Sequence, residues 1–327
     1  MTDDLLQHII EVTAAREIVK TEVIQELWSG YGHIYRCQLA GAKIQSVVVK
    51  QVKLPQEAAH PRGWNTDISH QRKLKSYHVE MAWYSGLAGS CDDHCRVPKT
   101  YSVSNGGDNM LIIMEDLNFA GFPQRIASPD MDEINACLLW LANFHARFMA
   151  VRSEGLWEVG TYWHLATRPD ELEAMKDQEL KAAAQRIDER LNQAQYQTIV
   201  HGDAKLDNFC FSENGKQVAA VDFQYIGHGC GMKDVAYLLS SCLHEEELNH
   251  CESMLLDYYF KALKEALDQH HQTSDFEEIR QEWSHLYKYA WADFYRFLDG
   301  WSPGHWKINT YSESIKNQVL NELSSKL

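Results

Sequence analysis

The sequence is organised around residues 199–209, which read Ile-Val-His-Gly-Asp-Ala-Lys-Leu-Asp-Asn-Phe. Apolar residues enter and leave this stretch, so its polar residues are expected in a loop between two strands. A second acidic site follows at residues 221–224, Val-Asp-Phe-Gln, where a carboxylate again ends an apolar run. Asn214-Gly215 lies between the two sites and is the strongest short signal for a β-hairpin. The sequence therefore predicts that Asp203 and Asp222 face each other across the mouth of one hairpin.

Two carboxylates placed in this way suit the transfer of a phosphoryl group. One aspartate positions the attacking hydroxyl and takes its proton, while a second aspartate and an asparagine oxygen hold magnesium against the nucleotide phosphates. Asn208 follows Asp203 by five positions and fits the asparagine role, and Lys205 could lie over the transferred phosphate. The alternative is an ordinary hairpin that carries two aspartates, which the paired signature at this spacing disfavours.

His-Gly-Asp at 201–203, Asn208 and the apolar-Asp-Phe-Gln segment together resemble the aminoglycoside-phosphotransferase and choline-kinase superfamily, built on the protein-kinase fold. The resemblance is closest to its ecdysteroid-kinase-like branch. It implies that Asp203 is the catalytic base and that Asn208 and Asp222 are the magnesium ligands. It also implies that Asp234 braces the catalytic loop.

The N-terminal part of the chain shows the pattern of a nucleotide-binding lobe. A short amphipathic helix within residues 5–15 is expected to cap it, followed by strands at 23–27, 34–39 and 44–52. Gly30 and Gly32 lie in the loop at 28–33 and would let backbone N–H groups approach phosphates, although a plain hairpin turn would look the same. The third glycine of the protein-kinase pattern is missing. Lys50 closes an apolar strand, where kinase-like enzymes place a phosphate-binding lysine.

A helix is predicted at about 69–87, after a flexible connection at 55–65 that contains two prolines and a glycine. Glu80 falls on its inward apolar stripe, and a buried acid needs a cationic partner. Lys50 is the expected partner, which would give the lysine–glutamate pair that presents lysine to phosphate. Arg72 and Lys73, outside the stripe, are the alternatives.

A hairpin over 97–103 and 110–114, with its turn at 105–108, completes the predicted five-stranded antiparallel lobe. The next residues resemble the hinge of kinases, where backbone groups of Glu115 and Leu117 would bind the adenine edge. The expected fold class is α+β, a bilobal protein-kinase-like fold. Residues 1–115 form the N-terminal nucleotide-binding lobe, and residues 116–327 form the mainly helical catalytic and acceptor-binding lobe.

Helix signals in the second lobe include Ser128-Pro129 as an N-cap followed by proline, and a helix running from 167 towards 191. Asp234 is expected to cap a further helix. Ser274-x-x-Glu277 is expected as the capping box of a helix that ends at 300. His145 is expected as a hydrogen-bonded core histidine, not as a base. Among the late aromatic residues, Trp301 and Trp306 are best placed to line an acceptor pocket.

Composition restricts the classes of partner. The chain has 327 residues and a formal net charge of −15, which argues against nonspecific binding to nucleic acid or to an anionic membrane. Eight cysteines without a disulfide-type framework suggest reduced thiols and a cytoplasmic location. Cys91 and Cys95 flank an Asp-Asp-His stretch, but this spacing is not that of a structural zinc site. The acidic N-terminus is wrong for a signal peptide, and no apolar run is long enough to span a bilayer.

The leading hypothesis is an ATP- and Mg²⁺-dependent kinase that phosphorylates a hydroxyl of a small molecule, for which sterol-like, sugar-like and quaternary-amine alcohols remain open. A protein serine/threonine kinase is the first alternative, because Asp203-x-Lys205-x-x-Asn208 matches such a catalytic loop. Gly202 in place of arginine, Gln224 in place of glycine and the missing Ala-Pro-Glu segment argue against it. A non-catalytic nucleotide-binding pseudokinase is the second alternative, and the presence of every required acid and lysine disfavours it.

Overall fold

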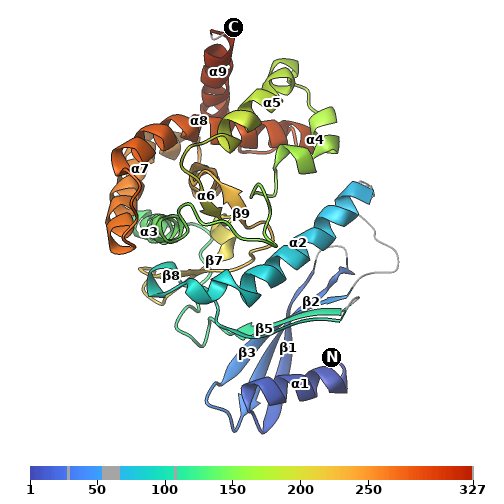
Figure 1. Cartoon of the computed structure of the whole chain (residues 1–327). Coiled ribbons are helices and arrows are strands. Elements are labelled where there is room, and N and C mark those ends of the chain that lie inside the picture. Colours follow the sequence, from blue (N-terminus) through green and yellow to red (C-terminus); the bar gives the residue numbers. More distant parts are fainter. Residues whose placement is uncertain (28–29, 54–66, 107–108, 326–327) are drawn as a thin grey trace.

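The structure is a computed structural model that describes residues 1–27, 30–53, 67–106 and 109–325. A five-stranded antiparallel sheet at one end is joined to a larger, mainly helical region (Figure 1). The predicted α+β, bilobal kinase-like architecture is therefore confirmed. The expected flexible connection at 55–65, and parts of the turns at 28–33 and 105–108, lie outside the described residues.

The sheet follows the chain with one crossover, in the strand order β1-β2-β3-β5-β4. Its strands are β1 (Glu17–Glu26), β2 (Gly32–Ala40), β3 (Ser46–Lys53), β4 (Thr100–Asn105) and β5 (Asn109–Glu115). The first strand is longer than the predicted 23–27. Most of its side chains are exposed because it lies at the sheet edge, so its N-terminal half carries no clear apolar pattern.

Two helices cover opposite faces of this sheet, α1 (Asp3–Thr13) on one side and α2 (Asp67–Ser85) on the other (Figure 1). Side chains of a strand alternate between faces, so Val47 and Val49 pack with Ile9 of α1. Lys50 has the opposite parity and lies on the α2 side, where Tyr77 is buried. The alternation of β3 thus directs a lysine out of the α1 core and towards α2.

The helical region contains α3 (Met131–Arg147), α4 (Pro169–Glu173), α5 (Gln178–Asn192), α6 (Met232–Cys242), α7 (Glu245–Gln269), α8 (Phe276–Trp301) and α9 (Thr310–Ser324). Between α5 and α6 lie four short strands: β6 (Thr198–Val200), β7 (Phe209–Phe211), β8 (Val218–Ala220) and β9 (Gly227–Gly229). A single large core of buried residues joins α2, α3 and the helices α6 to α9. No helix within the described part of the chain has the length and apolar character needed to cross a membrane.

Several predicted helix ends are wrong by a few residues. The cap of α3 is Asp130 and not Ser128, because Asp130 and Glu133 satisfy each other's backbone N–H groups in a capping box. The cap of α8 is Asp275 and not Ser274, since its carboxylate accepts from the N–H groups of residues 277 and 278. In each case the predicted cap and the observed cap are residues of types that favour this position, and they lie within two positions of each other.

Two other differences arise from the packing of α8. The helix predicted from 167 towards 191 is divided into α4 and α5, because Asp299 of α8 accepts hydrogen bonds from the backbone N–H groups of Lys176 and Asp177 at the break. α8 ends at Trp301, one residue after the predicted end at Gly300. A Cβ at that position would lie 1.8 Å from the Glu171 carbonyl oxygen, so glycine there permits a close approach of α4.

Candidate active site

The β7–β8 hairpin holds the two acidic segments together. β7 pairs antiparallel with β8, and Gly215 in the connecting turn has a φ of +72°, as the Asn-Gly signal predicted. Asp222 follows β8 by two residues, and Asp203 lies in the loop between β6 and β7. The strand that enters the loop, β6, pairs with β9 and not with the hairpin. Both loops are thus anchored at each end by short buried strands.

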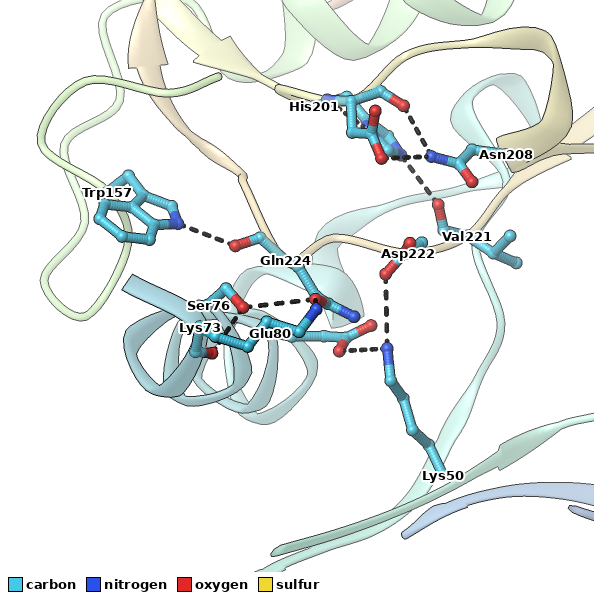
Figure 2. A network of polar contacts seen from close by, with 11 residues as sticks. Lys50, Lys73, Ser76, Glu80, Trp157, His201, Asn208, Val221, Asp222 and Gln224 are labelled. Atoms are coloured by element: carbon cyan, nitrogen blue, oxygen red, sulfur yellow. Dashed lines mark hydrogen bonds and ion pairs between the residues drawn. The ribbon is translucent and has the colours of Figure 1, made fainter. Parts of the chain in front are cut away.

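Asn208 is oriented by Asp203. Its Nδ2 donates to the Asp203 carbonyl oxygen at 2.7 Å and to the Asp203 carboxylate Oδ2 at 3.1 Å (Figure 2). Because both of these bonds use the amide nitrogen, the amide oxygen is the atom that remains for a ligand. Carboxylate and amide oxygens are donors that Mg²⁺ prefers, so Asp222 and Asn208 are chemically suited to hold it. No cluster of three or more histidine, cysteine or acidic side chains that could hold a metal occurs in the described chain.

His201 connects the two acidic segments, a role that the sequence pattern did not reveal. Its Nδ1 accepts from the Asp203 backbone N–H at 3.2 Å, so Nε2 carries the proton and donates to the Val221 carbonyl at 3.0 Å. The ring is fully buried, and burial lowers its pKa. His201 is therefore a neutral link that positions the residue before Asp222 relative to Asp203.

Asp234 braces the same loop. Its carboxylate accepts from the backbone N–H groups of His201 at 2.6 Å and Gly202 at 2.9 Å, and it lies 3.2 Å from Nε2 of His145. The prediction that Asp234 caps a helix is wrong, because α6 begins at Met232 with Gly231 before it, and the carboxylate points to the loop instead. His145 also contacts the Tyr259 hydroxyl at 2.7 Å and is fully buried, which confirms a hydrogen-bonded core histidine.

Lys50 joins the sheet to the acidic loops. Its Nζ lies 2.6 Å from Oε2 of Glu80 in α2 and 3.4 Å from Oδ1 of Asp222 (Figure 2). Desolvation alone would lower the pKa of Lys50, but the charges of Glu80 and Asp222 raise it, so the lysine is charged. The alternative partners of Glu80 are engaged elsewhere: Arg72 donates to the Thr167 carbonyl and Lys73 donates to Gln224.

The environments of the two aspartates move their pKa values in opposite directions. Burial raises the pKa of Asp203 to about 7, against the opposing charge of Lys205. Desolvation also acts to raise the pKa of Asp222, but the charges of Lys50, Lys73 and Lys205 outweigh it and hold that pKa below its usual value. The charge of Asp203 in turn raises the pKa of Lys205. At neutral pH one carboxylate is poised to exchange a proton, and the other is a permanent anion.

The glycine loop and the hinge residues lie at opposite ends of the sheet, because Gly32 pairs with Val52 at the end of β3 and Glu115 pairs with Val47 at its start. Gly30 and Gly32 both have positive φ, and a Cβ at Gly32 would lie 2.1 Å from the Gln51 carbonyl oxygen, so the start of β2 requires glycine. The Glu115 N–H donates to the Lys99 carbonyl, and the Leu117 carbonyl accepts from two N–H groups of the following turn. The groups of these two residues that could bind a base edge are therefore the Glu115 carbonyl and the Leu117 N–H.

Asp116, between these hinge residues, is an anchor that the sequence analysis missed. Its buried carboxylate lies 2.7 Å from Nε of Arg36 and accepts from the Ser46 hydroxyl at 2.7 Å. These contacts attach the hinge to β2 and β3, so the position of the Glu115 carbonyl follows from the sheet itself.

Aromatic residues surround the far side of Asp203. Tyr237, one helical turn after Asp234 in α6, lies beside the Asp203 carboxylate and packs against Tyr162, with the two ring centroids 5.5 Å apart. Lys307 lies over the Tyr237 ring, 4.9 Å from its centroid, and burial lowers the pKa of its ammonium to about 8.

The two predicted acceptor-lining tryptophans differ in exposure. Trp301 is partly buried and stacks on Phe297, whereas Trp306 is 47% exposed. Their contact with an acceptor stays a prediction.

Comparisons with known proteins show the family and the fold of this chain. The sequence model of the ecdysteroid kinase-like family matches residues 40–159 and 158–272. An amicoumacin kinase solved in complex with AMP-PNP, Ca²⁺ and Ami is similar in structure, with a TM-score of 0.52, 12% identity, and coverage of 100% of this chain and 94% of that one. A choline/ethanolamine kinase family protein from Mesorhizobium loti has a TM-score of 0.45, 13% identity and coverage of 97% and 94%. No curated protein matches the sequence. The family match spans most of the chain, including both acidic loops and Lys50, and the chain belongs to the ecdysteroid kinase-like family.

Proposed function

We propose that this protein is an ATP- and Mg²⁺-dependent phosphotransferase that moves the γ-phosphate of ATP to a hydroxyl group of a small molecule. The observation that carries the proposal is the convergence of Lys50, Glu80 and Asp222 beside the Asp203–Asn208 pair. Two acids of different ionisation, an oriented asparagine and a paired lysine are the parts that phosphoryl transfer requires. Membership of a kinase-like family supports the same reaction class.

In this proposal each side chain has one task. Asp203 accepts the proton of the acceptor hydroxyl, which its pKa of about 7 allows near neutral pH. Lys50, held by Glu80, binds the α- and β-phosphates, and Lys205 neutralises charge on the transferred phosphate. Asn208 and Asp222 would hold Mg²⁺, whose positive charge would offset the negative charge of the phosphate oxygens. These tasks need no covalent intermediate on the protein.

The nucleotide would be bound by residues 1–115 and the acceptor by residues 116–327, with Gly30, Gly32 and the backbone of Glu115 and Leu117 around the base and phosphates. The acceptor would lie on the aromatic side of Asp203, where Tyr237 is buried and Tyr162 is partly buried. All eight cysteines are free thiols, which suits the reducing cytoplasm.

A protein kinase is less well supported. Only residues 223–231 separate Asp222 from α6, and these residues are almost all buried. This leaves no long segment in that position that could receive a regulatory phosphate or dock a protein substrate.

The Asp203→Asn variant tests the proposal. It should bind AMP-PNP with Mg²⁺ as the wild type does in calorimetry, because the nucleotide and metal side chains are unchanged. It should consume no ATP with any acceptor that the wild type uses in a screen of hydroxylated metabolites. Full transfer by this variant would refute the assignment of the base. Absence of nucleotide binding by the wild type would refute the kinase proposal, and binding without ATP consumption across the screen would favour a pseudokinase.

A further inference from the structure

Gln224 occupies the position where the sequence departs from the glycine of protein kinases, and its side chain makes a contact that this glycine could not make. Its Oε1 accepts from Nζ of Lys73 in α2 at 2.9 Å, and its backbone carbonyl accepts from Nε1 of Trp157 at 2.8 Å (Figure 2). The residue is buried, at 6% exposure. A single residue, two positions after Asp222, therefore contacts both α2 and the loop that carries Trp157.

Ser76 of α2 also lies near the Gln224 side chain, but its contact is weaker than that of Lys73. Its hydroxyl lies 3.3 Å from Oε1 of Gln224 but only 2.7 Å from the Lys73 carbonyl. Because a hydroxyl has one proton, the shorter bond within the helix takes precedence and Lys73 is the main donor to Gln224.

Lys73, Ser76 and Glu80 lie on one face of α2, since residues three, four and seven apart share a face of a helix. Glu80 contacts Lys50 at 2.6 Å, one turn beyond the contact of Ser76 with Gln224. The same helical face thus positions the lysine that pairs with Asp222 and the residue that follows Asp222 in the chain.

The backbone at Asp222 needs such support. Its φ of +66° lies in the left-handed region, which a residue other than glycine adopts at a cost unless its surroundings enforce it. On one side the Val221 carbonyl accepts from His201, and on the other side Gln224 is held by Lys73 and Trp157. Asp222 lies between two anchored neighbours and has little freedom to turn.

We propose that Gln224 is a positioning residue: its side-chain amide fastens the Asp222 loop to α2, so that Asp222, Lys50 and Glu80 are assembled before a nucleotide binds. The inference rests on the proposed function, because it concerns the metal side of the same site. In this protein the bond from α2 replaces the long loop whose phosphorylation orders the corresponding segment in regulated protein kinases.

The neutrality of Gln224 has an electrostatic consequence. No ion pair between Lys73 and a carboxylate is present among the residues described, so the amide holds the ammonium without cancelling its charge. The ammonium of Lys73 therefore stays positively charged on the side of the loop that carries Gln224. Gln224 thus positions Asp222 through the backbone and keeps a positive charge close to it.

The test measures AMP-PNP binding by calorimetry, with Mg²⁺ and with EDTA, so that no acceptor is needed. Gln224→Met keeps the length of the side chain and removes the acceptor for Lys73. It should weaken Mg²⁺-dependent binding about tenfold, the loss expected when one hydrogen bond to a charged group is removed. Binding in EDTA should change less than twofold. Gln224→Glu restores an acceptor for Lys73 and should recover most of the loss.

Two further variants separate positioning from general damage. Gln178→Met removes a glutamine hydrogen bond at the start of α5 and is the matched control, with no expected change in either condition. Lys73→Met removes the other partner of the bond from a half-buried position, and it should reproduce the selective loss even where Gln224→Met folds poorly.

Each outcome has a distinct meaning. A wild-type protein that binds AMP-PNP no better with Mg²⁺ than with EDTA would refute the proposed function itself. A Mg²⁺-dependent wild type with unchanged Gln224→Met and Lys73→Met variants would overturn the positioning role alone. Equal weakening in both conditions would also overturn it, because the effect would then not pass through Asp222.

Discussion

The ionised form of Asp203 is expected to lower the free energy of unfolding at neutral and alkaline pH. Replacing Asp203 with a residue that cannot ionise should remove this loss of stability. Burial raises the pKa of its carboxyl from 3.8 to about 7 in the folded protein. Between these values the folded state retains a proton that the unfolded state has released, so stability falls as the pH rises through this window. Asp203→Asn keeps the shape of the neutral acid and cannot ionise, so the variant is free of this loss.

The size of the effect follows from the shift. Each pKa unit corresponds to about 1.4 kcal/mol, so ionising Asp203 costs about 4 kcal/mol of unfolding free energy well above pH 7, and about 3 kcal/mol of this develops between pH 5 and pH 8. At an unfolding entropy of about 2.1 cal/mol/K per residue, the change of about 3 kcal/mol between pH 5 and pH 8 corresponds to roughly 4 °C in melting temperature for a chain of this length.

Thermal melts of the wild type and Asp203→Asn at pH 5 and pH 8 measure the effect as a double difference. The advantage of the variant should be larger at pH 8 than at pH 5 by the amount calculated above. Asp207→Asn is the matched control, because its side chain is exposed in the same loop and its charge stays in water. If Asp203→Asn melts no higher than the wild type at pH 8, or exceeds it equally at both pH values, then ionisation of Asp203 does not destabilise the folded protein and the reasoning is refuted.

Two further predictions concern the support of the same loop. Gly202 has a φ of +81° and a Cβ there would lie 2.0 Å from the Tyr225 carbonyl oxygen, so Gly202→Ala should lower the melting temperature by several degrees, whereas Gly304→Ala, which meets nothing within 4 Å, should not. Asp234→Ala leaves two buried N–H groups without acceptors and should cost about 2–5 kcal/mol in denaturant titrations. The exposed Asp257→Ala should cost less than about 1 kcal/mol, and equal losses for the two aspartates would contradict the bracing role.

The features that the sequence predicted are those carried by neighbouring residues. The alternation of β3 and the stripe of α2 depend only on local periodicity, so the Lys50–Glu80 contact could be anticipated from the side on which each residue falls. The Asn214-Gly215 turn is likewise encoded in two adjacent residues. These local patterns predict the folded structure correctly because no distant contact overrides them.

The features that the sequence did not predict depend on distant contacts. Gln224 was visible as a departure from the protein-kinase pattern, but its acceptor role depends on Lys73, which is 151 positions away. The contact between Arg36 and Asp116 spans 80 positions and has no local signature. Tyr237 carries a weak signal, since it lies one helical turn after Asp234 and therefore on the side of α6 that faces the loop.

The two aspartates show why residue type and spacing alone could not divide the catalytic tasks. Asp203 and Asp222 have the same carboxylate, and each ends an apolar run. Burial beside aromatic side chains raises the pKa of Asp203 to about 7, whereas three lysine charges hold that of Asp222 low. A carboxylate that must take up and release a proton needs the first environment, and one that must remain an anion beside a cation needs the second. The opposite pKa directions therefore support the proposed division between a base and a metal ligand, and they arise from lysines that only the folded chain brings to one side.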